Sequence, residues 1–196
     1  MNVTKLDTGK IIFKNAKSVL FTPYTDADTV GSTTYDVTSI VADTLSFTPD
    51  DNTSNSKDSE FKDEPLFENI TLGKVQFAAT CIDFQNDVMK ALFGWSEENT
   101  SEGGKSVFAP TAYKELYSKI EVRFDDDTPI VVAPKVKLNS KAVISTLSTG
   151  SAEGQLAGTC YSALVKAGTM KAGKETSLCF LENSVKDSYQ VGSEIG

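Results

Sequence analysis

The sequence contains no histidine, and Arg123 is the single arginine among its 19 basic residues. Without histidine, the Ser-His-Asp and Cys-His catalytic arrangements are excluded. Specific binding of nucleic acid through its phosphates needs clustered Lys and Arg, whereas these lysines are scattered and the formal net charge is −8. The composition therefore argues against an enzyme and against a protein that binds DNA specifically.

Cysteine and long apolar runs are also scarce. Cys81, Cys160 and Cys179 are widely spaced and include no Cys-x-x-Cys pair, which predicts buried, reduced thiols and no zinc site. No stretch approaches the roughly 18 apolar residues of a membrane-spanning helix. The N-terminal residues lack the apolar core of a signal peptide. We therefore expect no cofactor, no metal ligands, no membrane segment and folding in a cytoplasm.

Two partial motifs fail at the positions that would carry their chemistry. Residues 168–174 match most of a phosphate-binding loop, but Glu175 stands where a hydroxyl should hold magnesium, and a strand is indicated where a helix should begin. We interpret this segment as a hairpin turn. Residues 26–31 resemble the start of a calcium loop, but Val30 and Val37 occupy ligand positions. We therefore expect no catalytic or cofactor-binding residues.

Strand-like patterns dominate the rest of the chain. Runs rich in Val, Ile, Phe and Thr, often alternating with polar residues, predict strands. These runs cover residues 9–22, 35–48, 70–82, 116–124, 130–132, 135–148, 155–166 and 176–181. We predict a mainly β protein, an antiparallel β-sandwich or barrel, forming a single domain over residues 1–196 with arm-like ends, including residues 184–196.

One short flanking helix is predicted, over about residues 84–93. Asp83 is a natural N-cap, and Gly94 is placed to end the helix. A helix of about three turns must pack against a sheet to be stable, and we expect Trp95 to pack under its end. An apolar stripe near helical spacing should provide the packing face: Phe84, Val88, Met89 and Leu92.

The segment 49–69 is the most unusual in the chain. Between residues 43 and 68 there are eight acidic residues against Lys57 and Lys62. The flanking strands are long, so we expect one extended antiparallel hairpin whose loop, about residues 49–69, protrudes. Apolar residues in this polar setting, namely Phe61, Leu66 and Phe67, indicate a segment that orders on meeting a partner. The alternative is that they fold back on their own domain.

Residues 37–95, with a long hairpin, an extended polar loop and a short helix ending in Leu-Phe-Gly, resemble the phage major tail tube proteins. The tube proteins of contractile injection systems and type VI secretion share this arrangement. The resemblance implies a structural virion protein of the tail, made in the cytoplasm of the host bacterium. Six subunits would close into a ring, and rings would stack into a hollow tube through which double-stranded DNA passes into the host.

The resemblance also implies partners and contact residues. The chain would bind copies of itself, the tape measure protein, the tail terminator and baseplate or tip proteins. The hairpin loop would bridge subunits and rings, which assigns contacts to Asp50, Asp51, Phe61, Leu66 and Phe67. Six subunits of −8 each carry roughly −48 formal charges, which would let DNA slide without binding.

Two other functions stay open at this point. A tail terminator, tail completion or head decoration protein is a virion component that would stop at one ring. A glycan-binding β-sandwich module would need exposed aromatic side chains on a concave sheet.

Overall fold

The computed structural model describes residues 16–37, 39–41, 43–59, 62–82, 85–99, 101–112, 115–124, 130–143, 153–182 and 184–192. For residues 54–59, 62–70 and 142–143 the description covers the backbone alone. Some predicted features lie outside the described residues: the first part of the strand at 9–22, the cap Asp83, and the side chains Phe61 and Phe84.

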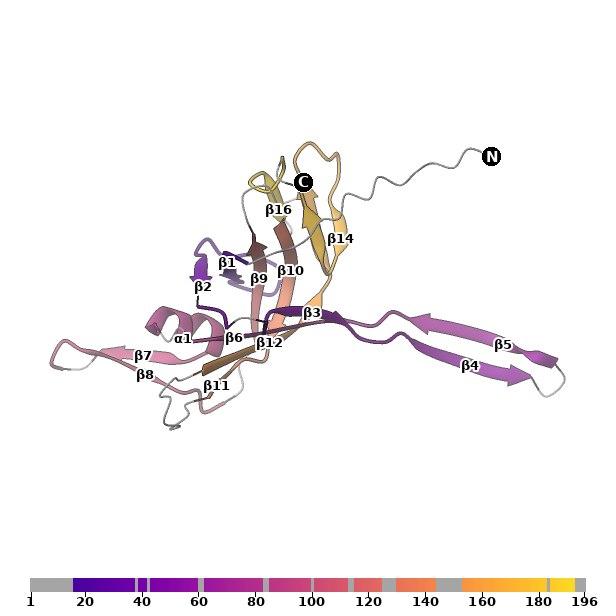
Figure 1. Ribbon diagram of the computed structural model, residues 1–196. Helices are drawn as coiled ribbons and strands as arrows, with labels where there is room; N and C mark the ends of the chain where they lie inside the picture. The colour runs from indigo at the N-terminus through magenta and orange to yellow at the C-terminus, as the bar shows by residue number, and fades with distance from the viewer. Residues whose placement is uncertain are drawn as a thin grey trace.

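The described chain is mainly β, with antiparallel sheets and a single helix, as predicted (Figure 1). A nine-stranded sheet has the path β2-β1-β9-β10-β12-β6-β3, with β11 paired to β12 and β15 paired to β10. Its strands are β1 (Ser18–Pro23), β2 (Tyr35–Val37), β3 (Ser46–Pro49), β6 (Val75–Cys81), β9 (Leu116–Arg123), β10 (Ile130–Leu138), β11 (Lys141–Val143), β12 (Glu153–Tyr161) and β15 (Cys179–Leu181).

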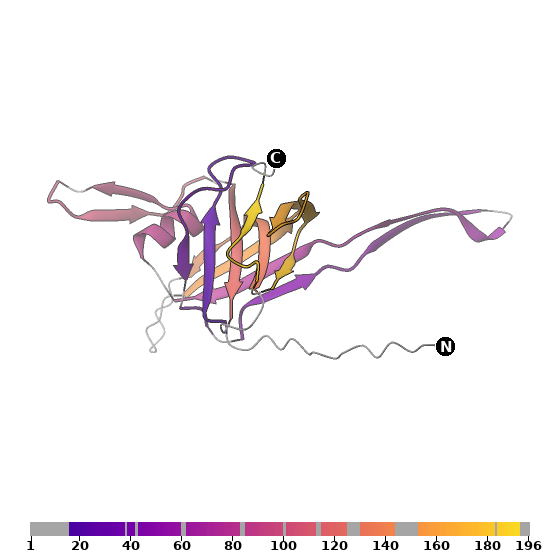
Figure 2. The same ribbon diagram turned by 90° about the horizontal axis from the view of Figure 1, so that it is seen from above.

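The large sheet folds over on itself. Strands β1 and β6 are four steps apart in the sheet, which is about 19 Å if the sheet were flat. Yet the rings of Phe21 on β1 and Phe77 on β6 meet edge to face with centroids 6.0 Å apart. The two halves of the sheet therefore face each other around one core, which gives a sandwich-like layout (Figure 2).

Strand β10 is the middle strand of the path of the large sheet. Its pairing register with β9 shifts between Ala133 and Val136, which marks a β-bulge. Pro134 sits inside this bulge and is buried. The sequence predicted two separate strand stretches on either side of Ala133 and Pro134, and the structure joins them into one strand because a bulge accommodates the missing N–H of proline.

The helix α1 (Asn86–Phe93) covers one region of the core. Its buried side chains are Val88, Met89, Leu92 and Phe93, and Trp95 packs partly buried against the same core. The helix ends at Gly94, which has φ 72° and therefore a left-handed backbone that glycine adopts without strain. The cap position is Gln85, in an extended backbone, so the helix begins two residues later than predicted.

The described residues of the predicted segment 49–69 form a two-stranded ribbon, whose pairing register shifts between Lys57 and Ser59. After β3 and β6 pair with Phe47 opposite Phe77, the hairpin continues as β4 (Thr53–Ser59) and β5 (Lys62–Thr71). The predicted long hairpin is thus confirmed, and its described residues from Thr53 to Ser59 and from Lys62 onward are paired strands. Asn, Asp and Pro have low strand propensity and all three occur in β4 or β5, so cross-strand pairing, and not local preference, makes these strands.

A second ribbon follows the helix, formed by β7 (Ser96–Asn99) and β8 (Lys105–Phe108). The sequence predicted a polar loop over 96–106, which is wrong at 96–99 and 105–106, where the chain is strand, whereas residues 101–104 lie in the turn between the two strands. In both views the two ribbons leave the body on opposite sides (Figures 1 and 2).

A three-stranded sheet lies near the C-terminus, with β13 (Ala163–Ala167) between β14 (Lys174–Thr176) and β16 (Tyr189–Val191). It accompanies a second, small core of Ile130, Val132 and Leu181. The prediction of an arm from residue 184 is wrong at Tyr189–Val191, where β16 pairs with β13. Residues 168–173 connect β13 to β14, and these strands pair antiparallel as the predicted hairpin turn requires.

Candidate assembly surfaces

The base of the acidic ribbon is held by a set of hydrogen bonds. The amide of Asp50 donates to the carbonyl of Lys74 at 2.7 Å. The side chain of Gln76 donates to Oδ2 of Asp50 at 2.7 Å, and the amide of Gly73 donates to Oδ1 of Asn52 at 3.0 Å. The ribbon therefore leaves the body from a fixed base.

Gly73 is required at this base. A Cβ atom at this position would lie 1.9 Å from the carbonyl oxygen of Asp50, which no side chain can tolerate. The sequence indicated a bulge at Gly73, and the structure uses residues 72–74 to separate β5 from β6. Beside it, Leu72 is 77% exposed, so the base carries a large apolar side chain open to a partner.

The predicted contact residues occupy different parts of the ribbon. Asp50 and Asp51 are exposed at its base, and Asp50 is also used internally by Gln76. Leu66 and Phe67 belong to β5, where Phe67 is opposite Lys57 in the register. Phe61 lies outside the described residues. Sequence reasoning missed Gln76 and Asn52, which hold the base, because their partners are 26 and 21 residues away.

Strands β4 and β5 form a separate sheet of two strands. Each therefore has one edge that pairs with no other described strand. Edge strands of this length are templates for pairing with another chain, and a lone two-stranded ribbon is marginally stable in water. The ribbon is thus the described surface most suited to binding a partner.

The second ribbon is tied to the helix by ion pairs. Lys90 contacts Asp87 at 2.8 Å and Glu97 at 3.0 Å, and Lys105 contacts Glu97 at 3.1 Å. Hydrogen bonds from Lys90 and Lys105 lower the pKa of the Glu97 carboxyl. Of these contacts, the Lys90–Glu97 pair joins α1 to the ribbon, and surface ion pairs of this kind contribute little stability.

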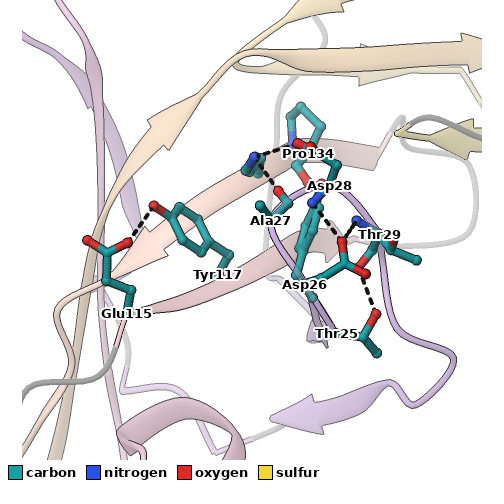
Figure 3. A network of polar contacts seen from close by, with 10 residues as sticks. Thr25, Asp26, Ala27, Asp28, Thr29, Glu115, Tyr117 and Pro134 are labelled. Carbon is teal, nitrogen blue, oxygen red and sulfur yellow. Dashed lines mark hydrogen bonds and ion pairs between the residues drawn. The ribbon is translucent and has the colours of Figure 1, made fainter.

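The calcium-like segment is held by a lysine. Oδ1 of Asp26 accepts hydrogen bonds from the amides of Asp28 and Thr29 at 3.0 and 2.9 Å (Figure 3). These bonds lower the pKa of Asp26. Nζ of Lys135 lies 3.4 Å from Oδ1 of Asp28 and donates to the carbonyl of Ala27. The Lys135 ammonium group therefore lies against this turn, beside one of its two carboxylates.

The same lysine lies among tyrosine rings on the polar face of the large sheet. Its Nζ is 5.7 Å from the ring centroid of Tyr24 and 5.3 Å from that of Tyr117. The hydroxyl of Tyr24 donates to the carbonyl of Pro134 at 2.8 Å, and burial, aided by the charge of Asp28, raises the pKa of Tyr24 to about 12. This arrangement fixes the turn on the sheet.

A buried polar cluster joins the C-terminal strands to the large sheet. Glu121 on β9 is 3% exposed and accepts hydrogen bonds from Nε of Arg123 and the hydroxyl of Tyr189 on β16. Nζ of Lys119 lies 5.0 Å from the ring centroid of Tyr189, and burial lowers the pKa of Lys119. Arg123 also approaches Asp187 at 3.4 Å. The cluster is paired internally and fits a structural role.

The cysteines are free thiols. Cys81 and Cys160 are buried as predicted, whereas Cys179 is only partly buried, so the prediction of burial is wrong for that residue. Burial raises the pKa of Cys160 and of Cys179 to about 11, which leaves both protonated and weakly reactive at neutral pH.

Among the residues that the structure describes, no three His, Cys, Asp or Glu side chains gather as a metal site. Within the same part of the chain, no helix has the length and apolar character needed to span a bilayer. Comparison with family models finds no match for this chain. No curated protein matches it either.

Proposed function

We propose that this chain is a structural virion protein that forms hexameric rings, and that these rings stack into the tail tube of a bacteriophage. The tube would conduct double-stranded DNA into the host without binding it specifically. The proposal includes the tape measure, tail terminator and baseplate or tip proteins as partners, and assembly in the bacterial cytoplasm. No step of this function needs catalysis or a cofactor.

The observation that carries the proposal is the β4–β5 ribbon. It leaves a sandwich-like body as a separate two-stranded sheet (Figures 1 and 2). Such a ribbon is marginal alone and has unpaired edges. Its base is nevertheless fixed by Asp50, Asn52 and Gln76. A ribbon that is hydrogen-bonded at its base and pairs with no other described strand has the edges that an inter-subunit contact requires.

Two further features support self-assembly. The path of the large sheet ends in β2 and β3, whose outer edges would be available for pairing around a ring. Edge pairing between copies produces closed rings or filaments. The acidic balance of −8 per chain repels DNA over a distance of about 10 Å, which suits a conduit and disfavours a protein that must hold DNA.

The test is electron microscopy of the purified chain at increasing concentration, beside a variant in which residues 53–71 are replaced by an Asn-Gly turn. The unaltered chain should form long tubes of uniform diameter, and the shortened variant should not. Circular dichroism and thermal melting serve as the folding control. Removing the ribbon takes away no residue of the described core, so the variant should melt close to the unaltered chain.

Each alternative outcome has a definite meaning. Single rings that never stack would favour a terminator or completion protein. Tubes formed equally well without the ribbon would show that the ribbon is not needed for assembly, and the argument from the ribbon would then be refuted. A chain that stays monomeric at all concentrations, and with added tube seeds, would refute self-assembly.

A further inference from the structure

The hairpin formed by β13 and β14 carries positive charge that the described chain does not neutralise. Residues 154–174 contain Lys166, Lys171 and Lys174 and no acidic residue, although the whole chain has a net charge of −8. None of these three lysines forms an ion pair with another described residue. Since Lys171 and Lys174 are exposed, their charges are open to a partner.

The turn between β13 and β14 is held in place by a later part of the chain. The amide of Gly168 donates to the carbonyl of Ser188 at 3.1 Å, and the amide of Met170 donates to the carbonyl of Ala167 at 3.2 Å. A Cβ atom on Gly168, which has φ 53°, would lie 2.9 Å from Cγ1 of Val185. The turn is therefore packed and hydrogen-bonded before any partner arrives, which reduces the entropy lost on binding.

The same turn also carries an exposed apolar side chain. Met170 is 38% exposed, and Lys171 follows it directly while Lys166 precedes it on β13. Methionine is flexible and polarisable, so it adapts to irregular partner surfaces. The hairpin thus combines an adaptable apolar contact with positive charges on either side of it in the sequence.

The acidic ribbon has the complementary composition. Residues 50–71 contain seven acidic residues against two lysines. On β5, Leu66 and Phe67 lie between Glu64 and Glu68 in the sequence. The ribbon also pairs with no other described strand. It therefore offers negative charge around apolar residues, where the hairpin offers positive charge around Met170.

We propose that the β13–β14 hairpin is the docking surface for the acidic ribbon of a second copy of this chain. In both views the ribbon extends away from its own body (Figures 1 and 2), so a neighbouring copy is the occupant that brings a ribbon to the hairpin. The two surfaces differ, so each copy gives its ribbon to one neighbour and receives the ribbon of another. Head-to-tail contacts of this kind generate rings and filaments. The inference rests on the self-assembly in the proposed function and names the surface that receives the ribbon.

The test exchanges the charges of the two surfaces. One variant carries Lys171→Glu and Lys174→Glu, and the other carries Asp63→Lys and Glu64→Lys. Neighbouring residues of a strand point to opposite faces, so the second variant changes the charge on both faces of the ribbon. Each variant alone should need about tenfold more protein or more to form tubes, because like charges then meet at the contact. An equal mixture of the two should form tubes as the unaltered chain does, since each ribbon then finds a hairpin of opposite charge.

The substitution Lys141→Glu is the matched control for Lys171→Glu. Lys141 is exposed on β11 and also forms no ion pair with another described residue. The two single variants have the same net charge, so they differ only in position. The control should assemble as the unaltered chain does, whereas Lys171→Glu should need about threefold more protein or more. Circular dichroism and thermal melting verify that each variant is folded.

Carbodiimide crosslinking of the unaltered chain identifies the contact directly, because this reagent joins a lysine amine to a carboxylate that touches it. Equal amounts of unlabelled and ¹⁵N-labelled chain are mixed before the reaction, and linked peptides are identified by mass. We expect links from Lys171 or Lys174 to acidic residues within 50–71, including links that contain both isotopes.

Each other result overturns a defined statement. Links that always contain a single isotope would place the ribbon on its own chain, and an absence of links between the hairpin and the ribbon would also overturn the proposal. If the two charge variants alone form tubes as readily as the unaltered chain, the docking is refuted and the tube function stands. If the unaltered chain gives the expected links with both isotopes but no tubes, the docking stands and the tube function is refuted.

Discussion

The contact between Tyr189 and Glu121 should hold the C-terminal strands on the large sheet, and the substitution Tyr189→Phe tests this. The change keeps the ring, which lies 5.0 Å from Nζ of Lys119, and removes only the hydroxyl. That hydroxyl donates to the carboxylate of Glu121, which is 3% exposed. A hydrogen bond to a charged group contributes about 1.5–3 kcal/mol.

Urea unfolding followed by circular dichroism measures the loss. A loss of about 2 kcal/mol, with a urea slope of about 2 kcal/mol per molar, lowers the midpoint by about 1 M without changing the slope. The matched control is Tyr161→Phe, which removes the hydroxyl of a tyrosine that is 36% exposed. This control should change the free energy of unfolding by less than about 0.5 kcal/mol.

A double-mutant cycle with Glu121→Gln measures the interaction free energy between Tyr189 and Glu121 apart from the other contacts of each side chain. If the two side chains interact as described, the double variant should lose less stability than the sum of the single variants, with a coupling of about 0.5–3 kcal/mol. Additive effects, or a midpoint for Tyr189→Phe within about 0.2 M of the unaltered chain, would refute the idea that this contact joins the two sheets.

Three further changes probe the core, the polar face and the ribbon. Leu92→Ala, at a side chain with 0% exposure, should cost about 2–5 kcal/mol in urea unfolding, and a loss below about 1 kcal/mol would contradict its place in the core. The pKa of Tyr24 is raised to about 12 in the folded chain, so its contribution to stability is present below about pH 10 and is lost as the pH rises toward 12. Absorbance titration should show one phenol that ionises near pH 12 and is missing in the variant Tyr24→Phe. If the phenol missing in this variant ionises near pH 10, the prediction is contradicted. Gly73→Ala would place Cβ 1.9 Å from the Asp50 carbonyl oxygen. The hydrogen exchange rate of the Asp50 amide should therefore rise, and tube assembly should fail, while the melting temperature of the chain stays unchanged. Normal tubes would show that assembly does not need an ordered base of the ribbon.

The sequence by itself determined the fold class and the helix. Alternation of Ile120 and Val122 with polar residues on β9 is a local pattern, and both side chains are buried. The stripe of Val88, Met89 and Leu92 and the end of the helix at Gly94 are equally local. Burial on one face of a strand or helix leaves a period in the sequence, so these features needed no knowledge of partners.

The tertiary structure alone decided the features that depend on distant residues. The strands of the acidic ribbon arise from pairing across the hairpin, as in Thr53 opposite Thr71, and their composition favours loops. The continuity of β10 through Pro134 depends on a bulge against β9, and the hydroxyl of Tyr189 finds Glu121 across 68 positions. Such pairings are selected by the free energy of the whole sheet, because backbone and side-chain groups must find partners wherever the chain brings them. The conformational preference of a short segment does not indicate which distant residue will be its partner.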